Sequence, residues 1–181
     1  MREVRTISRK GSQVTTSNVE QIPLDIGYYL AGFADGEGSF NVSFRRGPDY
    51  KGVPWKISLC FNVSQRDEEI LRVFQHQLGC GTMRTRPDGV WYFEVNDFES
   101  ITSRVIPFFM RFGFLSAKKR RDFRKFTEIA ALIKEGSHRT SQGVQEILRI
   151  RRDMNDGGAK RRKYADGIIL DQLRESSETT R

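Results

Sequence analysis

The sequence predicts an α+β fold with one antiparallel four-stranded sheet and helices on one of its faces. Three observations support this prediction. Apolar residues recur at helical spacing in four segments, apolar and polar residues alternate in four others, and the two kinds of segment follow a fixed order. The order is helix, two strands, helix, two strands, helix, helix. Strands that follow one another without an intervening helix are typical of antiparallel hairpins.

The first helix is predicted over residues 25–35, with Asp25 after Pro23 as its candidate N-cap. Strict alternation then predicts two strands of a long hairpin. The residues on its apolar side are Phe40, Val42 and Phe44 in the first strand and Trp55, Ile57, Leu59, Phe61 and Val63 in the second.

A helix over residues 67–78 is expected to stop at Gly79, because glycine readily ends a helix. A second hairpin follows over residues 82–86 and 90–95, joined by turn-forming residues. Its apolar side holds Trp91, Phe93 and Val95.

The last two helices complete the predicted fold. One is expected to start at Asn96 or Asp97 and to be interrupted by Pro107, which lacks a backbone N–H. Ser116 is expected to cap the other, which runs to Gly136. We expect a flexible arm over residues 1–21, a core domain over 22–136 and a basic helical extension over 137–181.

The composition narrows the possible partners. The 181 residues include 31 Lys and Arg against 23 Asp and Glu, giving a net charge of +8, which favours a polyanion such as nucleic acid or an acidic membrane face. With two cysteines and two histidines, a nitrogen and sulfur metal site is not expected, so any metal would have oxygen ligands. No apolar run approaches the roughly 20 residues that span a bilayer. We therefore expect an intracellular protein without a membrane partner, in a bacterial or archaeal cytoplasm or in an organelle.

The polar face of the predicted sheet is a candidate nucleic-acid surface, because its side chains can bond to base edges and phosphates and few of them are acids. An ordinary solvated sheet face is the alternative. The residues of this face are Asn41, Ser43, Arg45, Lys56, Ser58, Asn62, Ser64, Thr82, Arg84 and Arg86.

Residues 30–38 join the end of the first helix to two carboxylates, those of Asp35 and Glu37. Acids are unfavourable at a helix C-terminus, which carries partial negative charge, unless a positive group lies nearby. A hard cation such as Mg²⁺ would supply that charge and could support phosphodiester hydrolysis. A glycine-rich helix end leading into a strand is the alternative. Gly27, Ala31 and Gly32 also suit close packing against another helix, including a symmetry copy.

Residues 29–40, YLAGFADGEGSF, resemble the signature of the LAGLIDADG homing endonucleases. The resemblance extends over about residues 24–173, including the order of the strands and FNVSQ at 61–65. It implies an αββαββα fold with a curved sheet. It also implies a site-specific, intron-encoded endonuclease that cuts double-stranded DNA at a long pseudo-palindromic target, using Mg²⁺ or Mn²⁺, with Ca²⁺ as a non-cleaving substitute.

The resemblance also implies roles for individual residues. Glu37 would bind the metal together with the carbonyl of Gly36, and Gln65 would orient water near it. Lys118 and Lys119 both match a basic residue that assists the reaction, and Lys119 is favoured slightly. Asp35 would shape the helix end.

No second copy of the motif follows, so two chains are needed to cut two strands. The predicted homodimer interface contains Gly27, Tyr28, Ala31 and Gly32. Residues 143–173 are expected to form a helix with a basic side, which carries Arg149, Arg151 and Arg152, and to continue into loops with the cationic residues 160–163 that bind the DNA backbone. This segment would add DNA affinity, and a merely soluble tail is the alternative. An RNA maturase or a non-cleaving DNA-binding protein on the same fold is the alternative function.

Overall fold

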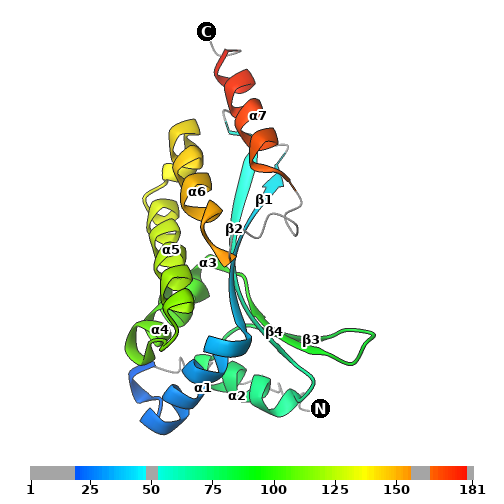
Figure 1. Ribbon diagram of the computed structural model, residues 1–181, viewed down its shortest axis with the longest axis vertical. Coiled ribbons are helices and arrows are strands. Elements are labelled where there is room, and N and C mark those ends of the chain that lie inside the picture. The colour runs from blue at the N-terminus through cyan, green and yellow to red at the C-terminus, as the bar shows by residue number, and fades with distance from the viewer. Residues whose placement is uncertain (1–18, 48–52, 156–163, 179–181) are drawn as a thin grey trace, which may run out of the picture.

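The computed structural model describes residues 19–47, 53–155 and 164–178 (Figure 1). Its strands form one antiparallel sheet in the order β1-β2-β4-β3, so the α+β prediction is confirmed. The elements are η1 (Val19–Gln21), α1 (Leu24–Glu37), β1 (Gly38–Arg46), β2 (Trp55–Gln65), α2 (Glu68–Leu78), β3 (Thr82–Thr85), β4 (Trp91–Val95), α3 (Phe98–Ser100), η2 (Ile101–Val105), α4 (Ile106–Phe112), α5 (Ala117–Lys134), η3 (Ser137–Arg139), α6 (Ser141–Arg152) and α7 (Asp166–Glu178).

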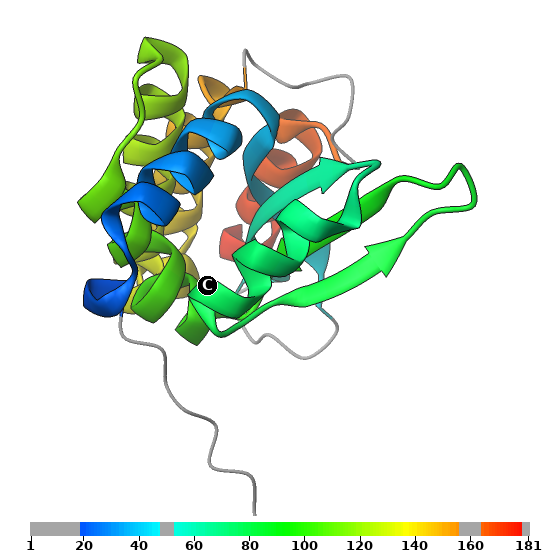
Figure 2. The same cartoon turned by 90° about the horizontal axis from the view of Figure 1, so that it is seen from below.

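Both predicted hairpins form. In the first, Phe40 pairs with Phe61, and in the second, Met83 pairs with Phe93. Because side chains alternate across a strand, this register puts all the large apolar residues on one face. Figure 1 shows α4, α5 and α6 along one side of the β1–β2 hairpin, while the β3–β4 hairpin projects away from these three helices and has α2 beside it, as Figure 2 also shows.

Phenylalanine rings make up much of the core under this face. Phe40 of β1 is surrounded by five others, with ring centroids 5.0–5.8 Å away: Phe61, Phe109, Phe114, Phe123 and Phe126. Those rings belong to β2, α4, the connection that follows α4, and α5. Aromatic pairs in such tilted and edge-to-face arrangements contribute beyond their buried area. The strand that directly follows the motif is therefore fixed from several sides.

One prediction about a helix end is wrong. Pro23, not Asp25, occupies the N-cap of α1, and Asp25 lies in the first helical turn, where a negative charge still suits the helix dipole. Next to Pro107 the α-helical hydrogen bonding is interrupted, but the backbone stays helical. There η2 is a wider π-helical turn, in which Ile106 N–H donates to the carbonyl of Ile101, and α4 begins with the proline in its first turn.

The packed part of the chain begins before residue 22 and extends beyond residue 136. Val19 is buried, and the Arg111 guanidinium donates to the carbonyl oxygens of Val19 and Ile22. Helix α6 buries one side within the same core as the rest of the chain. Residues 1–18 of the predicted arm and residues 160–163 lie outside the described residues. Within the described ranges, no helix has the length and apolar character of a membrane span.

Candidate functional site

The motif ends where α1 passes directly into β1. The backbone N–H of Gly38 donates to the Ala34 carbonyl, and a Cβ at Gly38 would lie 2.7 Å from that same oxygen. Only glycine fits so close to the last helical turn. Glu37 and Gly36 are exposed in that turn, whose carbonyl groups lack partners within the helix. Glu37 and Gly36 are therefore accessible to solvent where β1 begins.

Asp35 fastens this helix end to the start of α5. Its carboxylate accepts hydrogen bonds from the backbone N–H groups of Leu115 (3.1 Å) and Ser116 (2.9 Å), and a short one from the Ser116 hydroxyl. Burial would raise the pKa of Asp35, but the hydrogen bonds from Ser116 and Leu115 outweigh it and hold the pKa below its usual value. Asp35 is thus engaged within the chain, whereas Glu37 is exposed.

Lys119 reaches the motif from the first turn of α5. Its ammonium donates to the carbonyl of Gly38, the residue after Glu37. Burial lowers the pKa of Lys119, and the neighbouring carboxylates of Asp35, Asp122 and Glu37 oppose that shift. Lys118, the other matching lysine, is exposed. Lys119 therefore has a direct contact to the motif.

Gln65 is the last residue of β2. Because Val63 pairs with Gly38, Gln65 lies at the same end of the sheet as Gly36 and Glu37. Its side-chain carbonyl accepts a hydrogen bond of 2.8 Å from the Arg66 backbone N–H. The fold therefore brings the glutamine, the lysine and the exposed carboxylate to one edge of the molecule.

The donors at this edge are compatible with Mg²⁺. Within the described ranges no three His, Cys, Asp or Glu side chains cluster as a complete metal cage. Mg²⁺ commonly binds through one or two carboxylates together with water and substrate phosphates. Glu37 and the Gly36 carbonyl supply the oxygen ligands that this mode requires from a protein.

The residues of the predicted dimer interface differ in exposure. Gly27 and Ala31 are buried in their own chain, and a Cβ on Gly27 would lie 2.1 Å from the Phe112 ring of α4. Within this chain, Phe112 of α4 occupies the space beside Gly27, and Ala31 is 2% exposed. Tyr28 and Gly32 are exposed, and Tyr28 packs edge-on against Phe112 at 5.4 Å.

The polar face of the sheet runs in register across the strands. Asn41 pairs with Cys60, Ser43 with Ser58, and Arg45 with Lys56, while Asn62 and Thr82 both pair with Glu94. Ser64 and Arg84 both pair with Tyr92, and Arg86 follows the end of β3. The predicted surface residues thus lie on one side of the sheet, opposite the phenylalanine core.

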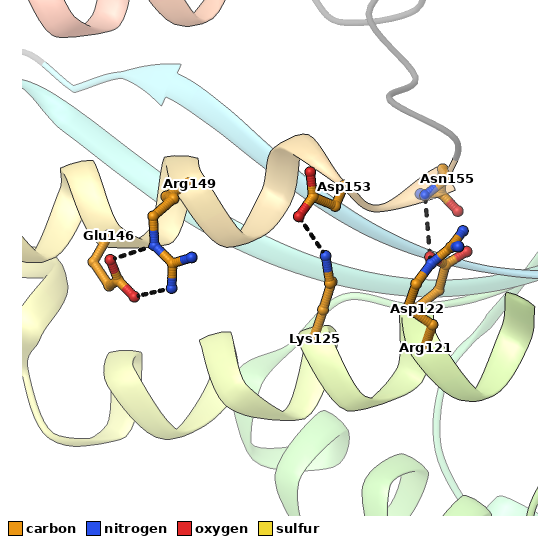
Figure 3. A network of polar contacts seen from close by, with 7 residues as sticks. All are labelled: Arg121, Asp122, Lys125, Glu146, Arg149, Asp153 and Asn155. Atoms are coloured by element: carbon orange, nitrogen blue, oxygen red, sulfur yellow. Dashed lines mark hydrogen bonds and ion pairs between the residues drawn. The ribbon is translucent and has the colours of Figure 1, made fainter.

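Ion pairs form between α5 and the end of α6 and also within α6, as Figure 3 shows. Lys125 bonds to Asp153 at 2.7 Å, and Arg149 bonds to Glu146 within α6. Arg151, predicted to lie on an exposed basic side, is instead 4% exposed, stacks over Phe44 and pairs with Asp166 of α7. That prediction is wrong for Arg151, which holds α7 to the sheet.

The same region contains two residues that the sequence patterns did not single out. Asn155 donates from its side chain to the Phe40 carbonyl at 2.8 Å, and its backbone N–H donates to the buried Asp122. Asp122 lies one turn after Lys119 on α5. No spacing rule links Asn155 to Phe40, because the two residues are 115 positions apart.

Comparison with known proteins places this chain in a family. The profile of the LAGLIDADG endonuclease family matches residues 30–130. "Probable intron-encoded endonuclease 2" of Neurospora crassa is 30% identical over 146 residues, which are 78% of this chain and 32% of that protein. The chain spans between 24% and 35% of the length of the curated relatives it matches.

Two solved structures match along nearly their whole length. The homing endonuclease I-TnaI has a TM-score of 0.68 at 27% identity, covering 88% of this chain and 99% of its own. The archaeal intron-encoded homing endonuclease I-Vdi141I, solved in complex with DNA, has a TM-score of 0.73 at 25% identity, covering 85% of this chain and 97% of its own. On the family profile, the relative and these structures, the chain belongs to the LAGLIDADG endonuclease family.

Proposed function

We propose that this protein is a site-specific endonuclease that cuts both strands of a long pseudo-palindromic DNA target as a homodimer. The observation that carries the proposal is the exposed Glu37 carboxylate at the end of α1, next to the Gly38 carbonyl that Lys119 contacts. The family match and the likeness to intron-encoded endonucleases support the same function.

Glu37 and the Gly36 carbonyl would hold Mg²⁺ or Mn²⁺. When bound, such an ion would polarise the scissile phosphate and lower the pKa of the attacking water. Gln65, at the same edge, would orient that water by hydrogen bonding. Lys119 would place a positive charge where negative charge develops during the reaction, a kind of stabilisation that single groups supply at about 10²–10³-fold in rate.

The two lysines provide a matched pair of variants. Lys119→Met is expected to lower the single-turnover cleavage rate about 100-fold. Lys118→Met removes the same charge one position away and is expected to leave that rate within a few-fold of the parent. An equal loss of cleavage rate in the two variants would contradict the proposed role of Lys119.

Dimer formation would use the exposed side of α1. On this helix, the side chains of Leu24, Tyr28 and Tyr29 are 58–60% exposed. Met110 of α4 is 73% exposed, and Leu115, just before α5, is 92% exposed. Exposed large apolar side chains on and next to α1 favour an interaction surface there. Gly32, with open space around it, lets a second helix approach.

Gly32→Arg is therefore expected to give a monomer in sedimentation experiments, whereas Gly167→Arg on α7 should leave the dimer intact.

The function as a whole is tested by incubating the protein with double-stranded DNA that contains sites selected for binding. Cleavage of both strands with Mg²⁺, and binding without cleavage with Ca²⁺, is the expected result. Tight binding with no strand broken under either Mg²⁺ or Mn²⁺ would contradict the proposal.

A further inference from the structure

The β3–β4 hairpin holds two arginine side chains in fixed positions on the polar face of the sheet. Arg84 Nη2 donates to Glu94 Oε2 at 2.5 Å, and the Arg86 guanidinium lies 4.6 Å from the centre of the Tyr92 ring. Both partners belong to β4. Arg84 is thus held by a carboxylate and Arg86 by an aromatic ring.

In both contacts the arginine reaches a β4 residue two positions beyond the one it faces. Arg84 is directly opposite Tyr92 but bonds to Glu94, two residues further along β4. Backbone pairing continues past the end of β3, since Arg86 N–H donates to the Val90 carbonyl, and Arg86 likewise reaches two residues further, to Tyr92. The two side chains lean in the same direction. Residues i and i+2 are about 6.6–6.8 Å apart along a strand, and the two guanidinium groups are expected to have a similar separation.

Glu94 is an unusual residue for this surface. It is the only acid in the four strands of the described chain. Its side chain is 18% exposed, and Asn96 also donates to it at 3.0 Å, so its position is fixed from two sides. Arg84 remains 62% exposed although it is bonded. A partly buried, oriented carboxylate thus holds a guanidinium that stays accessible to solvent.

Building on the proposed function, we infer that Glu94 and Tyr92 are positioning residues that hold Arg84 and Arg86 to read two guanines in each half-site. Arginine recognises guanine through two donors aimed at O6 and N7, so a guanidinium held in one orientation discriminates better than a mobile one. Base pairs rise about 3.4 Å each, so the arginine spacing matches two base-pair steps. The two guanine contacts lie two base pairs apart.

The test is selection of bound sequences from a randomised double-stranded DNA library by the full chain and by single variants. The parent is expected to select two G·C pairs, two positions apart in each half-site, each with a preference of roughly 5- to 150-fold. Arg84→Lys and Arg86→Lys identify which position belongs to which arginine. Glu94→Gln should weaken selection only at the Arg84 position, and Tyr92→Leu only at the Arg86 position.

Matched controls separate positioning from folding. Tyr92→Phe keeps the ring and is expected to keep the selected base, and Glu69→Gln removes an acid from α2, on the other side of the sheet. In an Arg84→Lys background, Glu94→Gln should cause no further change. Unchanged preference in Glu94→Gln and Tyr92→Leu, or Arg84 and Arg86 positions that are not two apart, would overturn the inference. Failure of the parent to select any DNA would instead overturn the proposed function.

Discussion

Replacing Asp35 tests how the motif is joined to the helix that carries Lys119. The carboxylate accepts three hydrogen bonds, from the backbone of Leu115 and from the backbone and hydroxyl of Ser116. A hydrogen bond to a charged group contributes about 1.5–3 kcal/mol, but these three share one carboxylate at a solvent-exposed turn and do not add fully. Asp35→Ala is therefore expected to lower the free energy of unfolding by about 2–4 kcal/mol.

A loss of that size corresponds to a fall of roughly 5–15 °C in Tm for a chain of this length. Thermal unfolding followed by circular dichroism measures it. Asp35→Asn keeps an oxygen acceptor for the backbone N–H groups and should lose about half as much. Asp25→Ala, in the first turn of α1, is the control and should lose about 0.3–1 kcal/mol. If Asp35→Ala were no less stable than Asp25→Ala, the carboxylate would not be what fastens α1 to α5.

Three further predictions concern packing, thiol reactivity and salt. Gly27→Ala should lower the free energy of unfolding by about 1–3 kcal/mol, because its Cβ would meet the Phe112 ring at 2.1 Å, whereas Gly167→Ala, in open space, should not; equal stabilities in urea unfolding would contradict this. Burial raises the pKa of both Cys60 and Cys80 to about 11 from an ordinary 9.0. At pH 8 the folded thiols should therefore react with iodoacetamide about 100-fold more slowly than in the unfolded chain, and equal rates would refute the burial argument. Log affinity for DNA should fall linearly with log salt concentration, and Arg45→Ala should reduce the slope by about 1.8, as expected for one phosphate contact in each half of a dimer. A slope that is the same in the variant would remove Arg45 from the phosphate contacts.

The strands and most helices could be predicted because their apolar periodicity matches the burial that the fold gives them. Alternation from Phe40 to Phe44 and from Trp55 to Val63 places the same residues in the core. Ser116 was recognisable as a helix cap, and its side chain accepts the expected backbone hydrogen bond. These features depend on residues that are close together in the sequence, so the sequence alone was sufficient to predict them.

Features that depend on contacts between distant segments could not be predicted. Gly27 and Ala31 look like a helix-pairing surface in sequence, but Phe112 occupies the space beside Gly27. Arg151 has the spacing of an exposed basic residue, yet Phe44 and Asp166 enclose it. The partners of Asp35 lie some 80 residues away. In each case the environment is set by tertiary packing, which periodicity within one helix does not contain.

Glu37→Gln tests the central claim most directly. The variant keeps the size of the side chain and removes the charge that would bind the divalent cation. Single-turnover cleavage of the selected DNA target with Mg²⁺ should fall by about 10³-fold or more. Binding to the same DNA in Ca²⁺-free buffer should stay within a few-fold of the parent, because Glu37 lies at the helix end and not on the polar sheet face. Cleavage by Glu37→Gln at the parent rate would contradict the account.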